Sequence, residues 1–258
     1  MCPVLFYPFL PILEPTRNSV RRKNVYNFIF DVDDTLYDQL EPFKKAFQEH
    51  FSPKKVISIE ALYRYSRKFS DEVFEQSQQG RISMDEMYIY RLTKAFNEFD
   101  ISIQPKQALA FQKDYAAFQD EITLLPDMEK TLDYCIRKQL TVGIITNGPS
   151  KHQRNKIKNL NLTHWINPKH IFVSGELKIA KPDKKLFHYV ESQMKLEPQK
   201  TFYIGDSYRN DVLGAKEAGW KAIWYNRRDY SITNKESQPD FIVGKEQKIY
   251  DLVRSLVE

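Results

Sequence analysis

Residues 25–36 read Val-Tyr-Asn-Phe-Ile-Phe-Asp-Val-Asp-Asp-Thr-Leu, an apolar, strand-prone run that ends in three carboxylates and a threonine. This pattern predicts a buried strand with a polar site at its carboxyl end. In an extended chain, side chains two positions apart point the same way, so Asp31 and Asp33 would face one small volume. The alternative is a solvated acidic turn, and the choice between the two depends on the residues downstream.

Two carboxylates this close need a compensating partner, and a hard divalent cation with a phosphate ester supplies one. In that chemistry Asp31 would attack phosphorus, and Asp33 would donate and later remove a proton. The stretch therefore raises the hypothesis of phosphoryl transfer at the end of the first strand.

The chain has 258 residues with 41% hydrophobic content, which suits a globular enzyme of one large or two modest domains. Its net charge is +5, but residues 1–24 hold four basic residues against one acidic residue and contribute +3 of it. No cluster of Lys and Arg interleaved with aromatic residues indicates nucleic-acid binding. Cys2 and Cys135, the two cysteines, offer neither metal-site spacing nor a disulfide framework, and indicate a reducing compartment.

We expect residues 1–24 to be a disordered leader or a mis-assigned start. Four prolines interrupt its apolar part, and its positive charges follow the apolar run instead of preceding it as in a signal peptide. The segment is also too short and too often broken by proline to span a bilayer. No other stretch approaches membrane length, so we expect a soluble, cytoplasmic protein without a membrane partner, as a monomer or homodimer.

From residue 37 to residue 120 the hydrophobic spacing is helical and predicts four amphipathic helices. Gly80 would end the second helix, and Ser83 with Glu86 forms a capping box that opens the third. Short turns between the helices predict a compact bundle inserted after the first strand. The helices are expected to begin at Pro42, to cover residues 59–78, to begin at Ser83, and to cover residues 105–118.

From residue 126 onward strands alternate with helices, which predicts a parallel sheet covered on both faces. The fold class is therefore α/β, a doubly wound parallel sheet of Rossmann type whose first two strands are separated by the helical bundle. The expected strands cover residues 140–145, 170–173, 201–204, 222–225 and 241–243, and the expected helices cover residues 127–138, 150–160, 183–195, 211–218 and 248–257.

Ligands of open α/β sheets bind at the carboxyl ends of the strands, and four predicted strand ends carry polar residues suited to a phosphate and a metal. Each of these elements alone could be an ordinary turn or helix cap. Lys178 is a second candidate, beside Lys181, for placing a positive charge against the phosphate. Four such elements in this order favour one shared site. They are Asp31 and Asp33, then Thr146-Asn147-Gly148, then Lys181-Pro182, then Gly205-Asp206-Ser207 with Asp211.

This set resembles the four motifs of the haloacid dehalogenase (HAD) superfamily, over about residues 25–258. The position of the helical insert resembles subfamily I, in which a C1 cap lies between the first two motifs. The resemblance implies a HAD-like core at residues 25–36 and 121–258 and a helical cap at residues 37–120.

Residues 172–176, 214–219 and 224–226 resemble, more narrowly, the branch that holds pyrimidine 5'-nucleotidases and N-acylneuraminate-9-phosphatases. Within the superfamily, the second aspartate of the first motif is typical of phosphatases and phosphomutases and generally absent from dehalogenases. Asp33 therefore favours transfer of a phosphoryl group to an oxygen acceptor.

The resemblance also implies a role for each motif residue. Asp31 would be the nucleophile that forms an aspartyl phosphate, and Asp33 the general acid and then base. Oxygen atoms of the motif aspartates would hold Mg²⁺, namely those of Asp31, the Asp33 backbone carbonyl, Asp206 and, in support, Asp211. The phosphate would be held by Thr146, Asn147 and Lys181, with Thr146 and Lys181 counted also as catalytic.

We expect a Mg²⁺-dependent phosphatase acting on a small cytosolic phosphomonoester, a nucleoside monophosphate first and a sugar or sugar-acid phosphate second. The alternatives are a phosphomutase of the same fold and a non-catalytic phosphate-binding protein. Substrate contacts are expected from residues 37–43 and from the turn at Gly80 and Arg81. Arg81 would either reach a substrate anion or face solvent.

Overall fold

The computed structural model describes residues 26–52, 56–231 and 237–258 of the chain. The expected leader at residues 1–24, with Cys2, lies outside the described residues. Among the helices that are described, none combines the length and the apolar character needed to cross a membrane.

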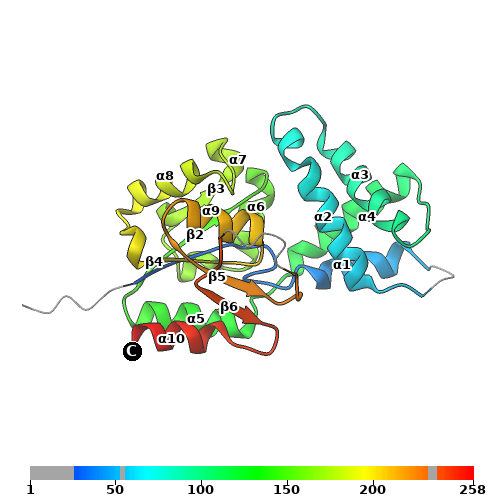
Figure 1. Cartoon of the computed structure of the whole chain (residues 1–258). Helices are drawn as coiled ribbons and strands as arrows, with labels where there is room; N and C mark the ends of the chain where they lie inside the picture. Colours follow the sequence, from blue (N-terminus) through cyan, green and yellow to red (C-terminus); the bar gives the residue numbers. More distant parts are fainter. Residues whose placement is uncertain (1–25, 53–55, 232–236) are drawn as a thin grey trace, which may run out of the picture.

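A six-stranded parallel sheet forms the centre of the larger part of the molecule (Figure 1), which confirms the predicted α/β class. The strand order is β3-β2-β1-β4-β5-β6, so β1 lies between β2 and β4. The strands cover Asn27–Phe30 (β1), Thr141–Thr146 (β2), Ile171–Val173 (β3), Thr201–Gly205 (β4), Lys221–Asn226 (β5) and Phe241–Gly244 (β6).

Helices cover both faces of this sheet, because successive side chains of the strands point to opposite sides. Phe28 and Phe30 of β1 pack in a cluster with α5, α6 and α10, whereas Ile29 packs in a second cluster with α8 and α9. All three side chains are fully buried. The helices cover Pro126–Arg137 (α5), Ser150–Asn159 (α6), Ser174–Leu177 (α7), Lys184–Met194 (α8), Gly214–Glu217 (α9) and Ile249–Val257 (α10).

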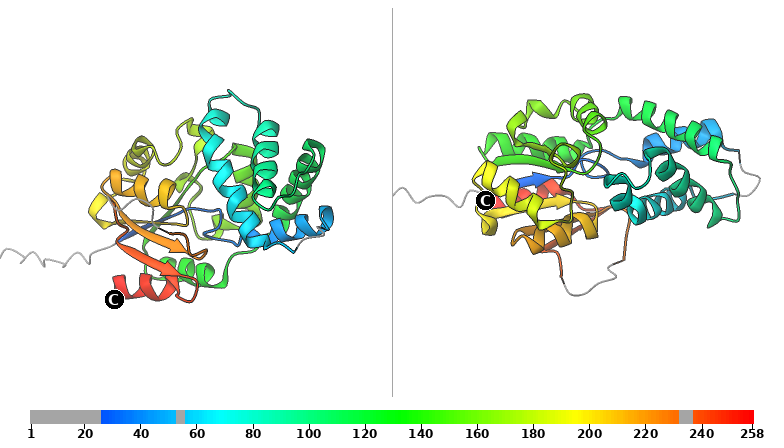
Figure 2. Two further views of the ribbon diagram at one scale, coloured as in Figure 1. Left: turned by 45° about the vertical axis from the view of Figure 1, so that its right-hand side comes forward. Right: turned by 90° about the horizontal axis from the view of Figure 1, so that it is seen from above.

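Four helices between β1 and α5 form a bundle beside the sheet (Figure 2), and they have a hydrophobic core of their own. The capping box of Ser83 and Glu86 is present, and Gly80 with φ +68° turns the chain after the second helix. The bundle boundaries at residues 37 and 120 stay a prediction. The helices cover Leu40–His50 (α1), Ile59–Gln78 (α2), Met84–Asn97 (α3) and Pro105–Phe118 (α4).

Two expected helix starts were wrong, and in each case a side chain just before the helix accepts a backbone N–H of its first turn. The first helix begins at Leu40 instead of Pro42, since Asp38 accepts the Leu40 N–H at 2.9 Å and proline is tolerated anywhere in a first turn. The helix expected from residue 211 begins earlier, as a wider turn at Tyr208–Leu213, because Ser207 Oγ accepts the Asn210 N–H. Other element ends differ from expectation by about one residue, within the usual uncertainty of such boundaries.

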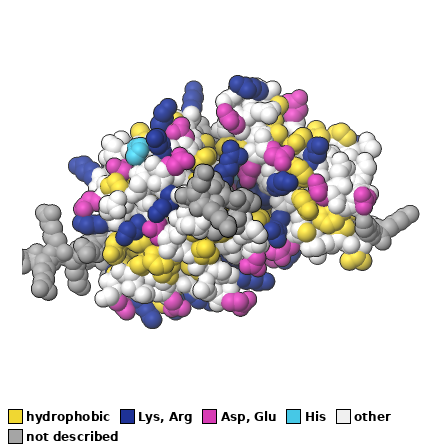
Figure 3. Space-filling view, in the orientation of Figure 1, with side chains coloured by type: hydrophobic (Ala, Val, Ile, Leu, Met, Phe, Trp, Pro, Cys, Tyr) yellow, Lys and Arg dark blue, Asp and Glu magenta, His cyan; other side chains and the backbone are white. Residues whose placement is uncertain are grey.

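Acidic and basic side chains are interspersed over the face of the molecule in Figure 3. Such mixing is typical of an ordinary solvated surface.

Candidate active site

Asp31 directly follows the central strand β1, and the sheet register explains where its neighbours come from. Phe30 is paired with Ile144 of β2 and with Ile204 of β4, and the Asp31 N–H continues the ladder to the Ile204 carbonyl at 2.9 Å. The carboxyl ends of β2 and β4 therefore lie beside the carboxyl end of β1. The carboxylate of Asp31 sits between them, and the Asp31 side chain is only 7% exposed.

Lys181 connects the nucleophile candidate to the acidic residues beyond β4. Its Nζ atom donates to Asp31 Oδ1 and to Asp211 Oδ1, each at 2.7 Å, and to the Tyr203 hydroxyl at 2.9 Å. Burial raises the pKa of Asp31 to about 7, with Lys181 opposing and the charge of Asp211 adding to the rise. Lys178, the other candidate from the sequence, is exposed, so Lys181 is the lysine that reaches Asp31.

The amide side chain of Asn147 orients the Lys181 segment. Asn147 Nδ2 donates to the Lys181 carbonyl, and Asn147 Oδ1 accepts the Lys181 N–H, both at 2.9 Å. These two bonds tie the end of β2 to the loop after α7. The side chain of Asn147 is thereby occupied, which leaves its backbone N–H as the group expected to meet a phosphate.

Thr146 and Thr35 each present a buried hydroxyl without a partner. Neither Thr146 Oγ1 nor Thr35 Oγ1 has a hydrogen-bond partner among the described residues, and both side chains are fully buried. A buried hydroxyl left unpaired costs about 1–3 kcal/mol. A phosphate oxygen bound beside Thr146 would remove that cost, which agrees with the phosphate-binding role expected for it.

Asp31, Asp206 and Asp211 form a group of carboxylates that fits a hard cation. One oxygen of each lies within 4.8 Å of the others. Burial and the nearby charges of Asp34, Asp211 and Asp31 raise the pKa of Asp206 well above its ordinary value. Oxygen ligands at this spacing suit Mg²⁺ or Ca²⁺, and a cation would relieve the repulsion.

Asp211 is held close to the sheet by two features. Its Oδ2 atom accepts the Ser207 N–H at 2.8 Å, while Oδ1 accepts from Lys181. Gly205 makes this approach possible, because a Cβ atom at that position would lie 2.3 Å from Asp211 Oδ2. Asp211 is thus positioned by its surroundings to support the other two carboxylates.

The side chain of Asp33 lies apart from this carboxylate group and contacts α6. Lys156 Nζ and the Tyr37 hydroxyl each donate to Asp33 Oδ1 at 2.5 Å, and Gln153 Nε2 donates to Oδ2 at 2.8 Å. Burial raises the pKa of Asp33, but Lys156 and these donors outweigh it and hold the pKa well below its usual range. Gln39 adds a further bond at 3.3 Å.

Sequence reasoning missed Gln153 and Lys156. They are three residues apart on the inward face of α6, next to the buried Ile157, and both are buried. The sequence held one signal for them: Gln153 and Lys156 are polar residues on the face of α6 that carries the apolar Ile157. Nothing in the sequence said that their partner was Asp33, which precedes them by more than a hundred residues.

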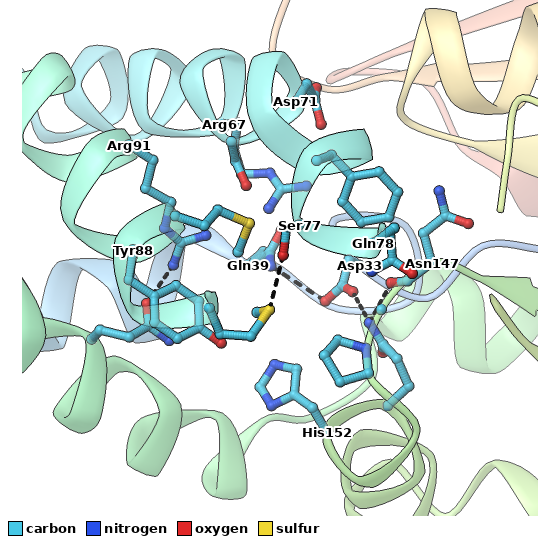
Figure 4. A pocket seen from close by; sticks show the side chains of 18 of the residues that line it. Asp33, Gln39, Arg67, Asp71, Ser77, Gln78, Tyr88, Arg91, Asn147 and His152 are labelled. Atoms are coloured by element: carbon cyan, nitrogen blue, oxygen red, sulfur yellow. Dashed lines mark hydrogen bonds between the residues drawn. The ribbon is translucent and has the colours of Figure 1, made fainter. Parts of the chain in front are cut away.

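A cleft of about 110 Å³ that opens to solvent lies between the helical bundle and the carboxyl ends of the strands (Figure 4). Asp33 and Asn147 line its sheet side, and Arg67 and Arg91 line its helical side. Gln39, from the stretch where substrate contacts were expected, also lines it. Arg81 is exposed and is absent from the lining, so its alternative of facing solvent agrees with the structure.

The family model for haloacid dehalogenase-like hydrolases matches residues 28–225. Among curated proteins, the chain is 26% identical to the HAD-hydrolase YfnB of Bacillus subtilis, covering 90% of this chain and 96% of that protein. It is 25% identical to pyrimidine 5'-nucleotidase PynA of Streptococcus pneumoniae, covering 88% and 94%, and 26% identical to human N-acylneuraminate-9-phosphatase, covering 88% and 93%.

Solved structures show the same fold. The magnesium-bound crystal structure of YfnB from Bacillus subtilis, described as revealing interdomain movement, matches with a TM-score of 0.67 and 22% identity over 91% of this chain and 99% of that one. A dehalogenase in an intermediate complex matches with a TM-score of 0.71 and 16% identity over 91% and 98%. The family match covers most of the chain and confirms the resemblance found in the motifs: this protein belongs to the haloacid dehalogenase-like hydrolase family.

Proposed function

We propose that the protein is a Mg²⁺-dependent phosphatase that hydrolyses a small cytosolic phosphomonoester through an aspartyl phosphate on Asp31. The observation that carries the proposal is the 2.7 Å contact of Lys181 with the buried Asp31 carboxylate, beside Asp206 and Asp211. The protein is a phosphoric monoester hydrolase, since several relatives that match along most of their length are named phosphatases. Nucleoside monophosphates and sugar phosphates are the first substrates to consider.

The residues of the site account for both halves of the reaction. The Asp31 carboxylate attacks phosphorus, the P–O ester bond breaks, and the leaving alkoxide takes the proton of the Asp33 carboxyl. Water then attacks the aspartyl phosphate and gives its proton to the Asp33 carboxylate. Inorganic phosphate leaves, and Asp31 and Asp33 return to their starting states.

The contacts of Asp33 with Lys156 and Tyr37 keep its side chain ionised, which is the form that accepts a proton from water in the second half of this cycle, although they also lower its basicity. The first half needs a protonated Asp33. A bound phosphate ester places negative charge next to Asp33, and nearby negative charge raises the pKa of a carboxyl group. Substrate binding thereby favours the proton that Asp33 must donate.

The phosphoryl group would be held by Lys181, the Thr146 hydroxyl and the Asn147 backbone N–H. Asp31, Asp206, Asp211 and the Asp33 carbonyl would hold the cation, and a Mg²⁺ ion bound there supplies positive charge that lowers the repulsion between phosphate and nucleophile. The magnesium-bound structure of YfnB supports this choice of metal. The unpaired Thr146 hydroxyl supports the choice of phosphate position.

Phosphate release from nucleoside monophosphates, sugar phosphates and phosphoglycolate tests the proposal, with Mg²⁺ and with chelator. Metal-dependent release that is absent in Asp31→Asn is the expected result. Release in the Asp31→Asn variant at more than about a hundredth of the wild-type rate would remove Asp31 as the nucleophile. Isomerisation of a sugar phosphate without net release would indicate a phosphomutase, and binding without either reaction would indicate a phosphate-binding protein.

A further inference from the structure

Arg91 of α3 is a buried cation without a carboxylate partner among the residues that the structure describes. Its side chain is 7% exposed and lines the cleft between the bundle and the sheet. Its guanidinium group donates to Gln112 Oε1 and lies over the rings of Tyr88 and Tyr115, at 5.1 Å and 5.9 Å from their centres. Burial lowers the pKa of Arg91, as expected where no carboxylate is paired with it.

The other buried cations in the described part of the chain are each paired with a carboxylate. Lys156 contacts Asp33, Lys181 contacts Asp31 and Asp211, and Arg228 contacts Asp34 and Asp38. Leaving a charge buried without an ionic partner is costly. Arg91 differs from the other three in that its environment lacks the anion.

Arg67 of α2 adds a second guanidinium group to the same wall. It is half-buried and lines the cleft, and Figure 4 shows it on the same side as Arg91, with its guanidinium directed toward the open space. The charge of Arg67 contributes to lowering the pKa of Arg91, which means that the two cations repel each other. The nearby carboxylate of Asp71 partly balances Arg67 but not Arg91.

The charges that line the cleft therefore leave its helical end positive. Lys156 is paired with Asp33, the charge of Arg67 is only partly balanced by Asp71, and Arg91 has no carboxylate partner among the described residues. His152 also lines the cleft, and burial lowers its pKa to about 4, so it carries no charge at neutral pH. Asp33 and Asn147, which belong to the proposed phosphate-transfer site, line the opposite, sheet side of the same cleft.

We propose that Arg91, assisted by Arg67, binds a second anionic group of the substrate, and that the preferred substrates are phosphomonoesters with a carboxylate or second phosphate at the far end. This inference rests on the proposed phosphatase function, because it assumes that the phosphate to be transferred sits at Asp31. A buried arginine pairs with a carboxylate or phosphate through two parallel hydrogen bonds. An uncharged sugar or base at that end would leave Arg91 unpaired.

Matched esters that differ only in the far group test the proposal. 6-Phosphogluconate and glucitol 6-phosphate differ by a carboxylate in place of a hydroxymethyl group, as do 3-phosphoglycerate and glycerol 3-phosphate. Glucose 1,6-bisphosphate against glucose 6-phosphate separates a second phosphate from a carboxylate. In at least one pair, the anionic member should have the higher kcat/KM, through a lower KM.

Arg91→Met keeps the length of the side chain and removes its charge. It should lower kcat/KM for the preferred anionic ester by about 10- to 100-fold, as for a lost charge-assisted hydrogen bond. The uncharged partner should change by less than about threefold, and Arg91→Lys should restore part of the preference. Arg81→Met, a change of an exposed arginine outside the cleft, should leave both values unaltered.

Binding separates failure of this inference from failure of the phosphatase proposal. Calorimetric titration of the inactive Asp31→Asn protein with each matched pair measures the affinity ratio without turnover, and it also covers the case in which Arg91→Met does not fold. Tighter binding of an anionic member supports the subsite even if no ester is hydrolysed. Equal affinities within every pair, or a preference unchanged in Arg91→Met, would overturn it.

Discussion

Lys156 of α6 lies 2.5 Å from Asp33, the second carboxylate of the first strand end, and both are buried or nearly so. The contact joins the helix after β2 to the strand end that precedes the bundle. It fixes the side chain proposed to move protons. Removing one partner of a buried ion pair destabilises a protein by much more than the pair's net contribution to stability, because the other charge is left unpaired.

Lys156→Met should therefore destabilise the protein by about 3 kcal/mol, the lower end of the range for breaking a buried pair, since Asp33 borders the cleft. Activity should fall as well, because Asp33 loses the donor that orients it. Urea unfolding and phosphate release measure the two effects. Lys158→Met, at an exposed position of the same helix, is the matched control and should change neither by much. A Lys156→Met protein as stable as Lys158→Met would contradict the ion pair.

The carboxylate group predicts opposite effects of Asp206→Asn with and without metal. In chelator, the variant should be at least as stable as the wild type, because burial and neighbouring carboxylates raise the pKa of Asp206 and disfavour its charged form. With Mg²⁺ at 100 times its Kd, the wild type should gain about 2.7 kcal/mol and the variant much less.

Unfolding of both proteins by urea, in EDTA and in Mg²⁺, measures this crossover. The same gain from Mg²⁺ in both proteins would place the ion elsewhere. Asp206 would then have no part in binding it.

Gly205→Ala should disturb the site through Asp211. An added Cβ atom would lie 2.3 Å from Asp211 Oδ2 and 2.4 Å from its Cγ, so the carboxylate must move away from Lys181 and Ser207. Overpacking of this kind costs about 1–3 kcal/mol. Thermal unfolding and Mg²⁺-dependent activity should both decline.

Gly244→Ala is the matched control for that substitution. The nearest atom to a Cβ there is Gln247 Oε1, at an ordinary contact distance of 3.8 Å. Its melting temperature should stay close to that of the wild type. Equal behaviour of the two variants would show that the close approach of Gly205 and Asp211 is not needed.

His152 predicts a pH dependence of stability. Burial, with help from the charges of Lys156 and Arg91 and against those of Asp33 and Asp120, lowers its pKa from 6.5 to about 4. Between these values the unfolded chain binds a proton that the folded protein does not, so stability falls as the pH drops from 6.5 to 4.

His152→Gln should remove that loss, which we expect to reach about 1–2 kcal/mol after allowance for partial exposure. The free energy of unfolding of both proteins, measured from pH 7 to pH 4.5, tests this. Their difference should grow in favour of the variant as the pH falls. Two parallel curves would show that His152 is protonated equally in both states.

The sequence by itself predicted the parallel sheet and the polar residues at its strand ends. Apolar runs alternating with helical spacing predict a parallel sheet, and such sheets collect their strand ends at one edge. The sequence pattern is therefore enough to make Asp31, Thr146, Lys181, Asp206 and Asp211 candidates for one shared site. It also predicted the capping box of Ser83, because a cap depends on residues only three positions apart.

The tertiary structure decided which side chains face these residues from elsewhere. Lys156 meets Asp33 because α6 follows β2, the strand paired with β1. Arg91 and Arg67 reach the cleft because α2 and α3 turn one face of the bundle toward the sheet. Such contacts depend on how separate elements pack, and the spacing of residues within one segment does not predict them. The site at the strand ends follows from residues that come directly after the strands in sequence. The positive charge on the helical side of the cleft arises only because the bundle packs against the sheet.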